Sequence, residues 1–298
     1  MGMKGRPFAA LWAAVSLALL ASMLLPAGAQ AGQYVTIDEK RGVRLYYEES
    51  GSGDPVVFVP GWTMTSRYFS RQVDYFRGSK STRFIVFDPR AHGRSTQTLE
   101  GANYIQHARD LKLFIDKLGL KHVVLGGWSW GMDTVYAYLS LYGADNVRAI
   151  VDVDQTPFPL ATGDGVWADG SVASVKPFFD DFTKDRVATT RGFLPTMFSK
   201  PPSPEELRWM ESEVMMTPEI VAGLLYYDGW MFDSTETARK LKVPQLYFVS
   251  EGNAKAAKVF LSRNIPDAEF VALGEHAMFY DHAAEFNARL AAFLAKHP

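Results

Sequence analysis

The chain contains no cysteine and has no large excess of charge of either sign. Its 298 residues include 31 Lys and Arg against 33 Asp and Glu, a formal net charge of −2. The lack of cysteine excludes disulfides, thiolate metal sites and a cysteine nucleophile. The balanced charge argues against a nucleic-acid partner, because such proteins usually carry a basic excess. His-Glu-x-x-His motifs and phosphate-binding glycine loops are also absent, so we expect neither a metal nor another cofactor.

Residues 1–31 have the pattern of an export signal. Lys4 and Arg6 precede an apolar run over 8–25, and Pro26 follows it. The triplets 27–29 and 29–31 are both A-x-A cleavage sites. The alternative is an uncleaved membrane anchor, since the run is near the lower length limit for a spanning helix. We expect a cleaved signal, a periplasmic or secreted domain over 32–298, and no stable membrane anchor after cleavage.

Apolar strand-like runs alternate with helical stretches along most of the remaining chain. This alternation is typical of an α/β fold with a mostly parallel sheet covered on both faces. The segment 51–53 (Gly-Ser-Gly) is interpreted as a hairpin turn. Strands are expected over 34–37, 44–48, 56–59, 84–87, 123–125, 147–153, 243–249 and 270–273, and helices over 104–118, 133–141 and 283–295.

The alternation breaks down between about 155 and 242. This stretch is rich in aromatic residues and methionine, is interrupted by prolines over 201–204, and has helical patterns over 205–215 and 218–225. Such an insertion predicts a helical cap over the carboxyl ends of the strands, where open α/β sheets bind ligands. Most of its aromatic side chains are expected to pack the cap onto the core.

The segment 127–131 (Gly-Trp-Ser-Trp-Gly) directly follows the apolar run 123–125. A short strand, then Gly-x-Ser-x-Gly, then a helix is the sequence form of a nucleophile elbow. Its glycines allow the close approach that a tight strand-to-helix turn requires. The turn holds Ser129 in a strained conformation at the positive end of the next helix. Ser129 is therefore the candidate nucleophile.

Three further segments, together with this elbow, resemble the α/β-hydrolase superfamily, and bacterial aryl esterases and cofactor-free haloperoxidases in particular. They are 60–62 (Pro-Gly-Trp), 88–95 (Asp-Pro-Arg-Ala-His-Gly-Arg-Ser) and 274–276 (Gly-Glu-His). The resemblance implies an α/β-hydrolase fold with a mostly parallel eight-stranded sheet, flanking helices and a helical cap. It also implies chemistry without a cofactor.

The resemblance assigns His276 as the base that activates Ser129 and later as the acid. Backbone N–H groups of Trp62 and Trp130 would form the oxyanion hole. We also expect the rings of Trp62, Trp128 and Trp230 to contact substrate. The chain departs from the family at Pro60, where histidine is usual; proline lacks an N–H but leaves the later donors intact.

The resemblance implies a catalytic triad of Ser129, His276 and an acidic residue. Three residues are candidates for the acid. Many relatives carry it in a Gly-x-x-Asp pattern after the strand expected over 243–249, but Asn253 occupies that position here. Other relatives place the acid at the end of the strand after the elbow helix, which favours Asp154. Asp152, two residues earlier on the same face, and Glu251 remain alternatives.

These patterns predict an exported serine hydrolase that cleaves apolar carboxylic esters or lactones through an acyl-serine intermediate. Its partner is then a small-molecule substrate. One alternative is perhydrolysis on the same scaffold, in which peroxide intercepts the acyl-enzyme. The other is a non-catalytic binding protein that kept the pocket, and the missing aspartate at Asn253 favours it.

Overall fold

The computed structural model describes residues 32–162 and 166–298. The predicted signal peptide, 1–31, lies outside the described residues, as do 163–165 within the predicted cap. Among the described residues, no helix has the length and apolarity needed to cross a membrane.

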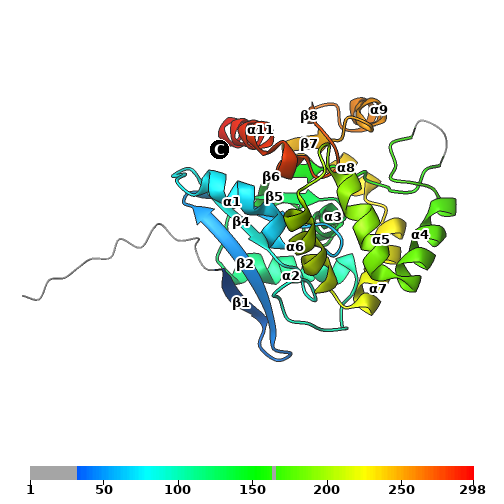
Figure 1. Cartoon of the computed structure of the whole chain (residues 1–298). Helices are drawn as coiled ribbons and strands as arrows, with labels where there is room; N and C mark the ends of the chain where they lie inside the picture. Colours follow the sequence, from blue (N-terminus) through cyan, green and yellow to red (C-terminus); the bar gives the residue numbers. More distant parts are fainter. Residues whose placement is uncertain (1–31, 163–165) are drawn as a thin grey trace, which may run out of the picture. The chain divides into compact units, whose positions relative to one another are not determined.

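An eight-stranded sheet in the order β1-β2-β4-β3-β5-β6-β7-β8 organises the domain (Figure 1). Strand β2 pairs antiparallel with β1 and β4, and every other pairing is parallel. The predicted mostly parallel eight-stranded sheet is confirmed. Its strands are β1 (Gln33–Asp38), β2 (Val43–Gly51), β3 (Asp54–Val59), β4 (Thr82–Phe87), β5 (Val123–Trp128), β6 (Val147–Val153), β7 (Gln245–Val249) and β8 (Glu269–Ala272).

Helices cover both faces of the sheet, and each face has its own apolar core. This double coverage explains why β5 and β7 are buried along their whole length and read as continuous apolar runs. One face packs against α2 (Tyr104–Lys117), α3 (Gly131–Tyr142), α8 (Thr235–Lys240) and α9 (Ala254–Asn264). The other packs against η1 (Ser66–Phe69), α1 (Ser70–Phe76), α10 (Met278–Asp281) and α11 (Ala283–Lys296).

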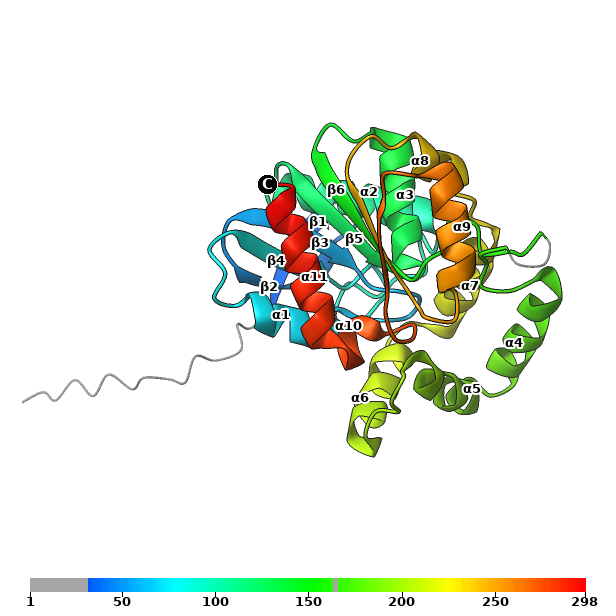
Figure 2. The same ribbon diagram turned by 90° about the horizontal axis from the view of Figure 1, so that it is seen from above.

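The chain between β6 and β7 forms a helical insert. Figure 2 shows α4, α5 and α6 beyond the helices that cover the sheet. Ser203 and Glu206 form a capping box that starts α6, with Pro204 in its first turn. The remaining helices of the insert, besides α8, are α4 (Val172–Lys184), α5 (Arg186–Phe193), η2 (Leu194–Met197), α6 (Pro204–Met215) and α7 (Glu219–Met231).

One local interpretation of the sequence was wrong. The segment Gly51–Ser52–Gly53 joins β2 to β3, but β4 lies between these two strands in the sheet, so the segment does not close a hairpin. Its glycines allow positive φ angles of 74° and 107°. A Cβ on Gly51 would lie 2.3 Å from the carbonyl oxygen of Thr82. These glycines thus permit a tight exit beside β4.

Candidate active site

Ser129 lies in the sharp turn between β5 and α3. Its φ of 53° is left-handed, a strained conformation for a residue with a side chain. A Cβ on Gly127 would lie 2.5 Å from the Met132 nitrogen, and one on Gly131 would lie 2.3 Å from the Val59 carbonyl oxygen. Both positions therefore require glycine. The Ser129 N–H donates to the Val153 carbonyl at 2.9 Å, which attaches the turn to β6.

Asp154 and His276 form a close pair beside this turn. Nδ1 of His276 lies 2.8 Å from Oδ2 of Asp154, whose other oxygen accepts the Ser250 N–H at 2.7 Å. Asp154 follows β6 with a φ of 53° and is 6% exposed, and His276 follows β8 on the loop that leads to α10. The pair joins positions 122 residues apart.

Each partner shifts the pKa of the other toward an ion pair. Burial alone would raise the pKa of the Asp154 carboxyl, but the hydrogen bond and charge of His276, with the Ser250 N–H, lower it below its usual value. Burial likewise acts to lower the pKa of His276. The hydrogen bond and charge of Asp154 outweigh it and raise that pKa.

The other two candidate acids lie elsewhere. Asp152 is fully buried in β6, where it accepts hydrogen bonds from the Tyr136 hydroxyl and the Gln155 N–H, both at 3.0 Å. Burial raises the pKa of Asp152 well above its usual value, which favours the neutral acid. Glu251 is exposed. Of the three acids, Asp154 is the one that contacts His276.

Ser129 and His276 line the same cavity of about 530 Å³. No hydrogen bond joins their side chains among the described residues, and Nε2 of His276 faces no protein partner there. Catalytic hydrogen bonds are often long before substrate binds. The cavity is lined by Gly61, Trp62, Met64, Trp128, Ser129, Trp130, Asp154, Ala168, Asp169, Ser174, Phe178, Phe193, Thr196, Met197, Tyr226, Trp230, Ser250, Asn253, Glu275 and His276.

Both expected oxyanion donors border this cavity. Trp130 directly follows Ser129 at the start of α3, and Trp62 lies in the turn after β3. Gly61 allows that turn to approach Ser129 closely: a Cβ there would lie 3.1 Å from the Ser129 Cβ. Within the described residues, the backbone N–H groups of Trp62 and Trp130 donate to no protein group. Both amides are thus free for a substrate oxygen.

The three tryptophans expected to contact substrate, Trp62, Trp128 and Trp230, all line the cavity together with Trp130, but the four rings differ in their other contacts. Trp128 is 1% exposed, and its indole N–H donates to the His276 carbonyl at 2.9 Å, which supports the histidine loop. The indole N–H of Trp62 donates to the carbonyl of Ala222 in α7 at 2.8 Å. Trp130 packs edge-on against both Trp62 and Trp230. These rings are part of the apolar lining of the cavity.

Sequence reasoning missed two carboxyl groups in the cavity, Asp169 and Glu275. Asp169 precedes α4, in a loop of the insert that carries no recognisable motif. Although Asp169 keeps an exposed surface, the surrounding protein desolvates its carboxyl group and raises the pKa to about 7. Glu275 directly precedes His276, so its place beside the histidine could have been read from the sequence. Within 32–162 and 166–298, no lysine or arginine lines the cavity.

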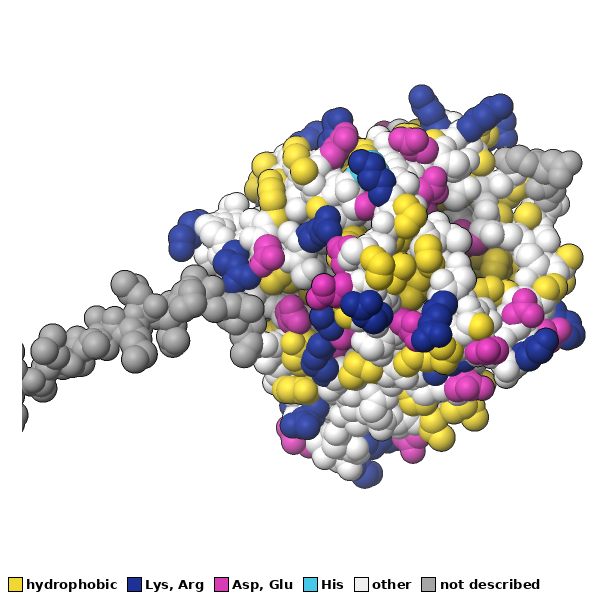
Figure 3. Space-filling model, viewed as in Figure 1, with side chains coloured by type: hydrophobic (Ala, Val, Ile, Leu, Met, Phe, Trp, Pro, Cys, Tyr) yellow, Lys and Arg dark blue, Asp and Glu magenta, His cyan; other side chains and the backbone are white. Residues whose placement is uncertain are grey.

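The described residues hold no cluster of three or more His, Asp or Glu side chains suited to a metal ion. On the face seen in Figure 3, basic and acidic side chains are intermixed. Neither sign covers a broad continuous area of the described residues on that face.

Comparison with known proteins decides the family. The family model described as the alpha/beta hydrolase fold matches residues 54–230. The chain belongs to this family. A bifunctional esterase/perhydrolase of Acinetobacter calcoaceticus is 29% identical over 73% of this chain and 81% of its own. A non-heme haloperoxidase of Rhodococcus erythropolis is 33% identical over 50% of this chain and 53% of its own.

The fold is also that of a solved structure, the bromoperoxidase of Bacillus anthracis. Its TM-score is 0.81 at 24% identity, covering 89% of this chain and all of the other. The resemblance inferred from the motifs, to an α/β hydrolase with haloperoxidase and esterase relatives, is confirmed.

Proposed function

We propose that this α/β hydrolase is a serine hydrolase that cleaves apolar carboxylic esters or lactones through an acyl-serine intermediate. The observation that carries the proposal is the 2.8 Å Asp154–His276 pair in the cavity that also contains Ser129. A free serine hydroxyl is too weak a nucleophile near neutral pH. An oriented imidazole activates it by accepting its proton as the oxygen attacks.

In this mechanism, Nε2 of His276 accepts the proton of Ser129 Oγ as the oxygen attacks the carbonyl carbon. The Asp154 carboxylate accepts the hydrogen bond from the Nδ1–H of His276, which orients the ring and stabilises the imidazolium. The N–H groups of Trp62 and Trp130 stabilise the oxyanion, and such a donor contributes roughly 3–4 kcal/mol to acyl transfer. His276 then protonates the departing alkoxide. Water, deprotonated by the same imidazole, finally releases the acid and restores Ser129.

The cavity supports a neutral, apolar substrate. Its wall consists largely of aromatic rings and methionine, which bury apolar groups favourably. Among the described residues, its charged groups beyond the Asp154–His276 pair are the carboxyls of Asp169 and Glu275, so an anionic acyl chain would meet charge of its own sign. A volume of about 530 Å³ is within the usual range for small-molecule sites.

Hydrolysis of p-nitrophenyl esters from acetate to octanoate, by the protein over 32–298 and by its Ser129→Ala variant, tests the proposal. We expect turnover with a preferred chain length, and a loss of about 10⁶-fold in kcat in the variant. A fluorophosphonate probe should label the wild type and not the variant. Absence of both turnover and labelling would favour the non-catalytic binding protein.

Perhydrolysis is the second candidate, and the esterase/perhydrolase relative favours it. Hydrogen peroxide would replace water in deacylation, giving a peracid and free Ser129. Peracetic acid formed from p-nitrophenyl acetate and peroxide, measured against acetate formed by hydrolysis, separates the two outcomes. The perhydrolase candidate requires peracid to exceed acetate at millimolar peroxide.

We also propose that the protein is exported to the periplasm or secreted after removal of residues 1–31. The basic start, the apolar run and the paired A-x-A sites support this. N-terminal sequencing of the protein recovered outside the cytoplasm should begin at Gly32, or at Gln30 where the first A-x-A site is cut instead. Recovery of the intact N-terminus in the membrane fraction would instead indicate an uncleaved anchor.

A further inference from the structure

Glu213 is a buried carboxylate of the insert with no place in the mechanism above. It lies in α6 and is 3% exposed. Oε2 of Glu213 accepts the Thr65 hydroxyl at 2.7 Å, and Oε1 accepts from Arg67 at 3.2 Å and Arg94 at 3.3 Å. A buried carboxylate needs such partners, and here every one of them lies in the core domain.

Thr65 ends the turn that carries the backbone N–H of Trp62. Within this turn the Met64 N–H donates to the Gly61 carbonyl at 3.0 Å. Thr63 has a φ of 59°, a costly conformation for a β-branched residue. Such strain persists only where the surroundings hold the backbone in place. The turn therefore depends on contacts made from outside it.

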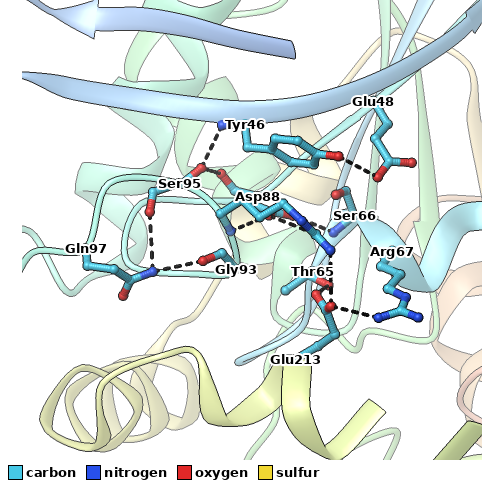
Figure 4. Close-up of polar contacts among 11 residues, drawn as sticks. Tyr46, Glu48, Thr65, Ser66, Arg67, Asp88, Gly93, Ser95, Gln97 and Glu213 are labelled. Carbon is cyan, nitrogen blue, oxygen red and sulfur yellow. Dashed lines mark hydrogen bonds and ion pairs between the residues drawn. The ribbon is translucent and has the colours of Figure 1, made fainter. Parts of the chain in front are cut away.

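Two carboxylates hold the end of the turn from two sides. Oδ1 of Asp88, after β4, accepts the Ser66 N–H at 2.7 Å, while Glu213 accepts the Thr65 hydroxyl. Figure 4 shows Glu213 reaching from α6 toward Thr65, with Asp88 approaching Ser66 from the other side. Arg94 joins the two acids, because its backbone N–H donates to Asp88 at 2.8 Å and its guanidinium to Glu213.

We propose that Glu213 is a positioning residue for the oxyanion hole, fixing through Thr65 the turn that places the Trp62 N–H over Ser129. This inference rests on the proposed serine hydrolase function. A second hydrogen bond between this turn and the insert runs from the Trp62 indole N–H to the Ala222 carbonyl in α7. The insert thus shapes the pocket and also sets the geometry of one oxyanion donor.

The expected effect lies in kcat, because an oxyanion donor acts mainly on the transition state. A misplacement of about 1 Å can cost about 100-fold in rate. We expect Glu213→Leu to lower kcat about 10- to 100-fold on the preferred p-nitrophenyl ester, with KM changed less than about threefold.

A trifluoromethyl ketone provides a readout that a purely structural role would not move. It forms a tetrahedral adduct with Ser129 whose oxyanion needs the same donors, so its Ki should rise by the factor lost in kcat/KM. The matched control is Glu211→Gln. Glu211 lies on the same helix but pairs with Arg191 inside the insert, and its variant should stay within about twofold of wild type.

Thr65 provides a second test if Glu213→Leu fails to fold. Thr65→Val removes the hydroxyl at nearly constant volume and should lower kcat in the same direction. Thr65→Ser keeps the hydroxyl and should restore most of that loss. Unchanged kcat and Ki in the Glu213 and Thr65→Val variants, or losses confined to Tm and KM, would overturn the inference. If the wild type hydrolyses no ester and resists the fluorophosphonate, the proposed function itself fails.

Discussion

The core side and the insert side of the cavity are built in different ways. The core side supplies the polar atoms Ser129, Asp154 and His276, each at the end of a strand or just beyond it. Ser129 and Asp154 have positive φ, and buried hydrogen bonds hold both residues in that strained conformation. The core side also supplies the rings of three tryptophans. The insert side supplies rings such as Phe178, Tyr226 and Trp230, which pack on one another, and the carboxyl group of Asp169.

This difference separates the chemistry from the selectivity. Polar atoms act through distances that hydrogen bonds fix to a fraction of an ångström, whereas rings act through the volume they occupy. Changes on the core side should therefore alter kcat by orders of magnitude, and changes to the insert's rings should alter which substrate is preferred. Glu213 is the exception, because it belongs to the insert and accepts a hydrogen bond from Thr65, at the end of the turn that carries Trp62.

The largest predicted effect is that of Asp154→Asn. We expect kcat to fall about 10⁴-fold, because the amide favours the wrong tautomer of His276 and does not stabilise its charged form. Asp152→Asn is the matched control, an acid-to-amide change two residues earlier in β6. Its kcat should stay within about threefold of wild type, because Asp152 does not contact His276 and because burial already favours its neutral form. The reverse ranking would make Asp152 the triad acid.

The second prediction concerns pH. Only neutral His276 accepts the serine proton, so kcat/KM should rise with pH to a plateau, and two units below the pKa activity should be about 100-fold lower. Asp154 raises the pKa of His276, so the wild-type inflection should lie above pH 6.5. In Asp154→Asn it should move to lower pH. The pH dependence of kcat/KM on a neutral ester, measured for both proteins, gives the two inflections. The same inflection in both would contradict the pairing of Asp154 with His276.

The third prediction addresses the insert side. Trp230→Leu removes an indole from the cavity wall, so the ratio of kcat/KM for octanoate over acetate should rise about tenfold. Trp209→Leu, which removes an indole of α6 that does not line the cavity, should leave this ratio unchanged. The ester series provides the measurement. A large loss of kcat on acetate in Trp230→Leu would mean that the insert's rings also serve the chemistry.

The smallest predicted effect is that of Asp169→Asn. At pH 8.5, above the pKa of about 7, Asp169 is charged and should repel an anionic acyl chain. The variant should improve kcat/KM for p-nitrophenyl monoglutarate, relative to the neutral pentanoate, about fivefold. Glu251→Gln removes an exposed charge outside the cavity and should change this ratio less. If both variants changed the ratio equally, the effect would come from the net charge of the protein and not from the position of Asp169 in the cavity.

Most of the sheet could be predicted because a strand that is buried on both faces appears in the sequence as a short run of consecutive apolar residues. The strand expected over 147–153 is β6 itself, and the elbow run extends to Trp128. The insert was harder to predict: α6 and α7 carry clear starts, but α4, α5 and α8 were not predicted. Local start signals were present for two of them, because Ser171 and Ser174 form a capping box at α4 and the Asp185 side chain caps α5. The short α8 lacks a side-chain cap.

The sequence by itself determined the candidate nucleophile, Ser129, because the elbow's strand, glycines and serine are contiguous and their geometry is local. It also restricted the acid to three residues without choosing among them. Only the tertiary structure shows which of the three contacts His276, because it brings the ends of β6 and β8 together so that Asp154 meets His276 across 122 residues. It likewise revealed Asp169 in the cavity and Glu213 against the oxyanion turn. Such contacts depend on how separate elements pack, and no short stretch of sequence records that packing.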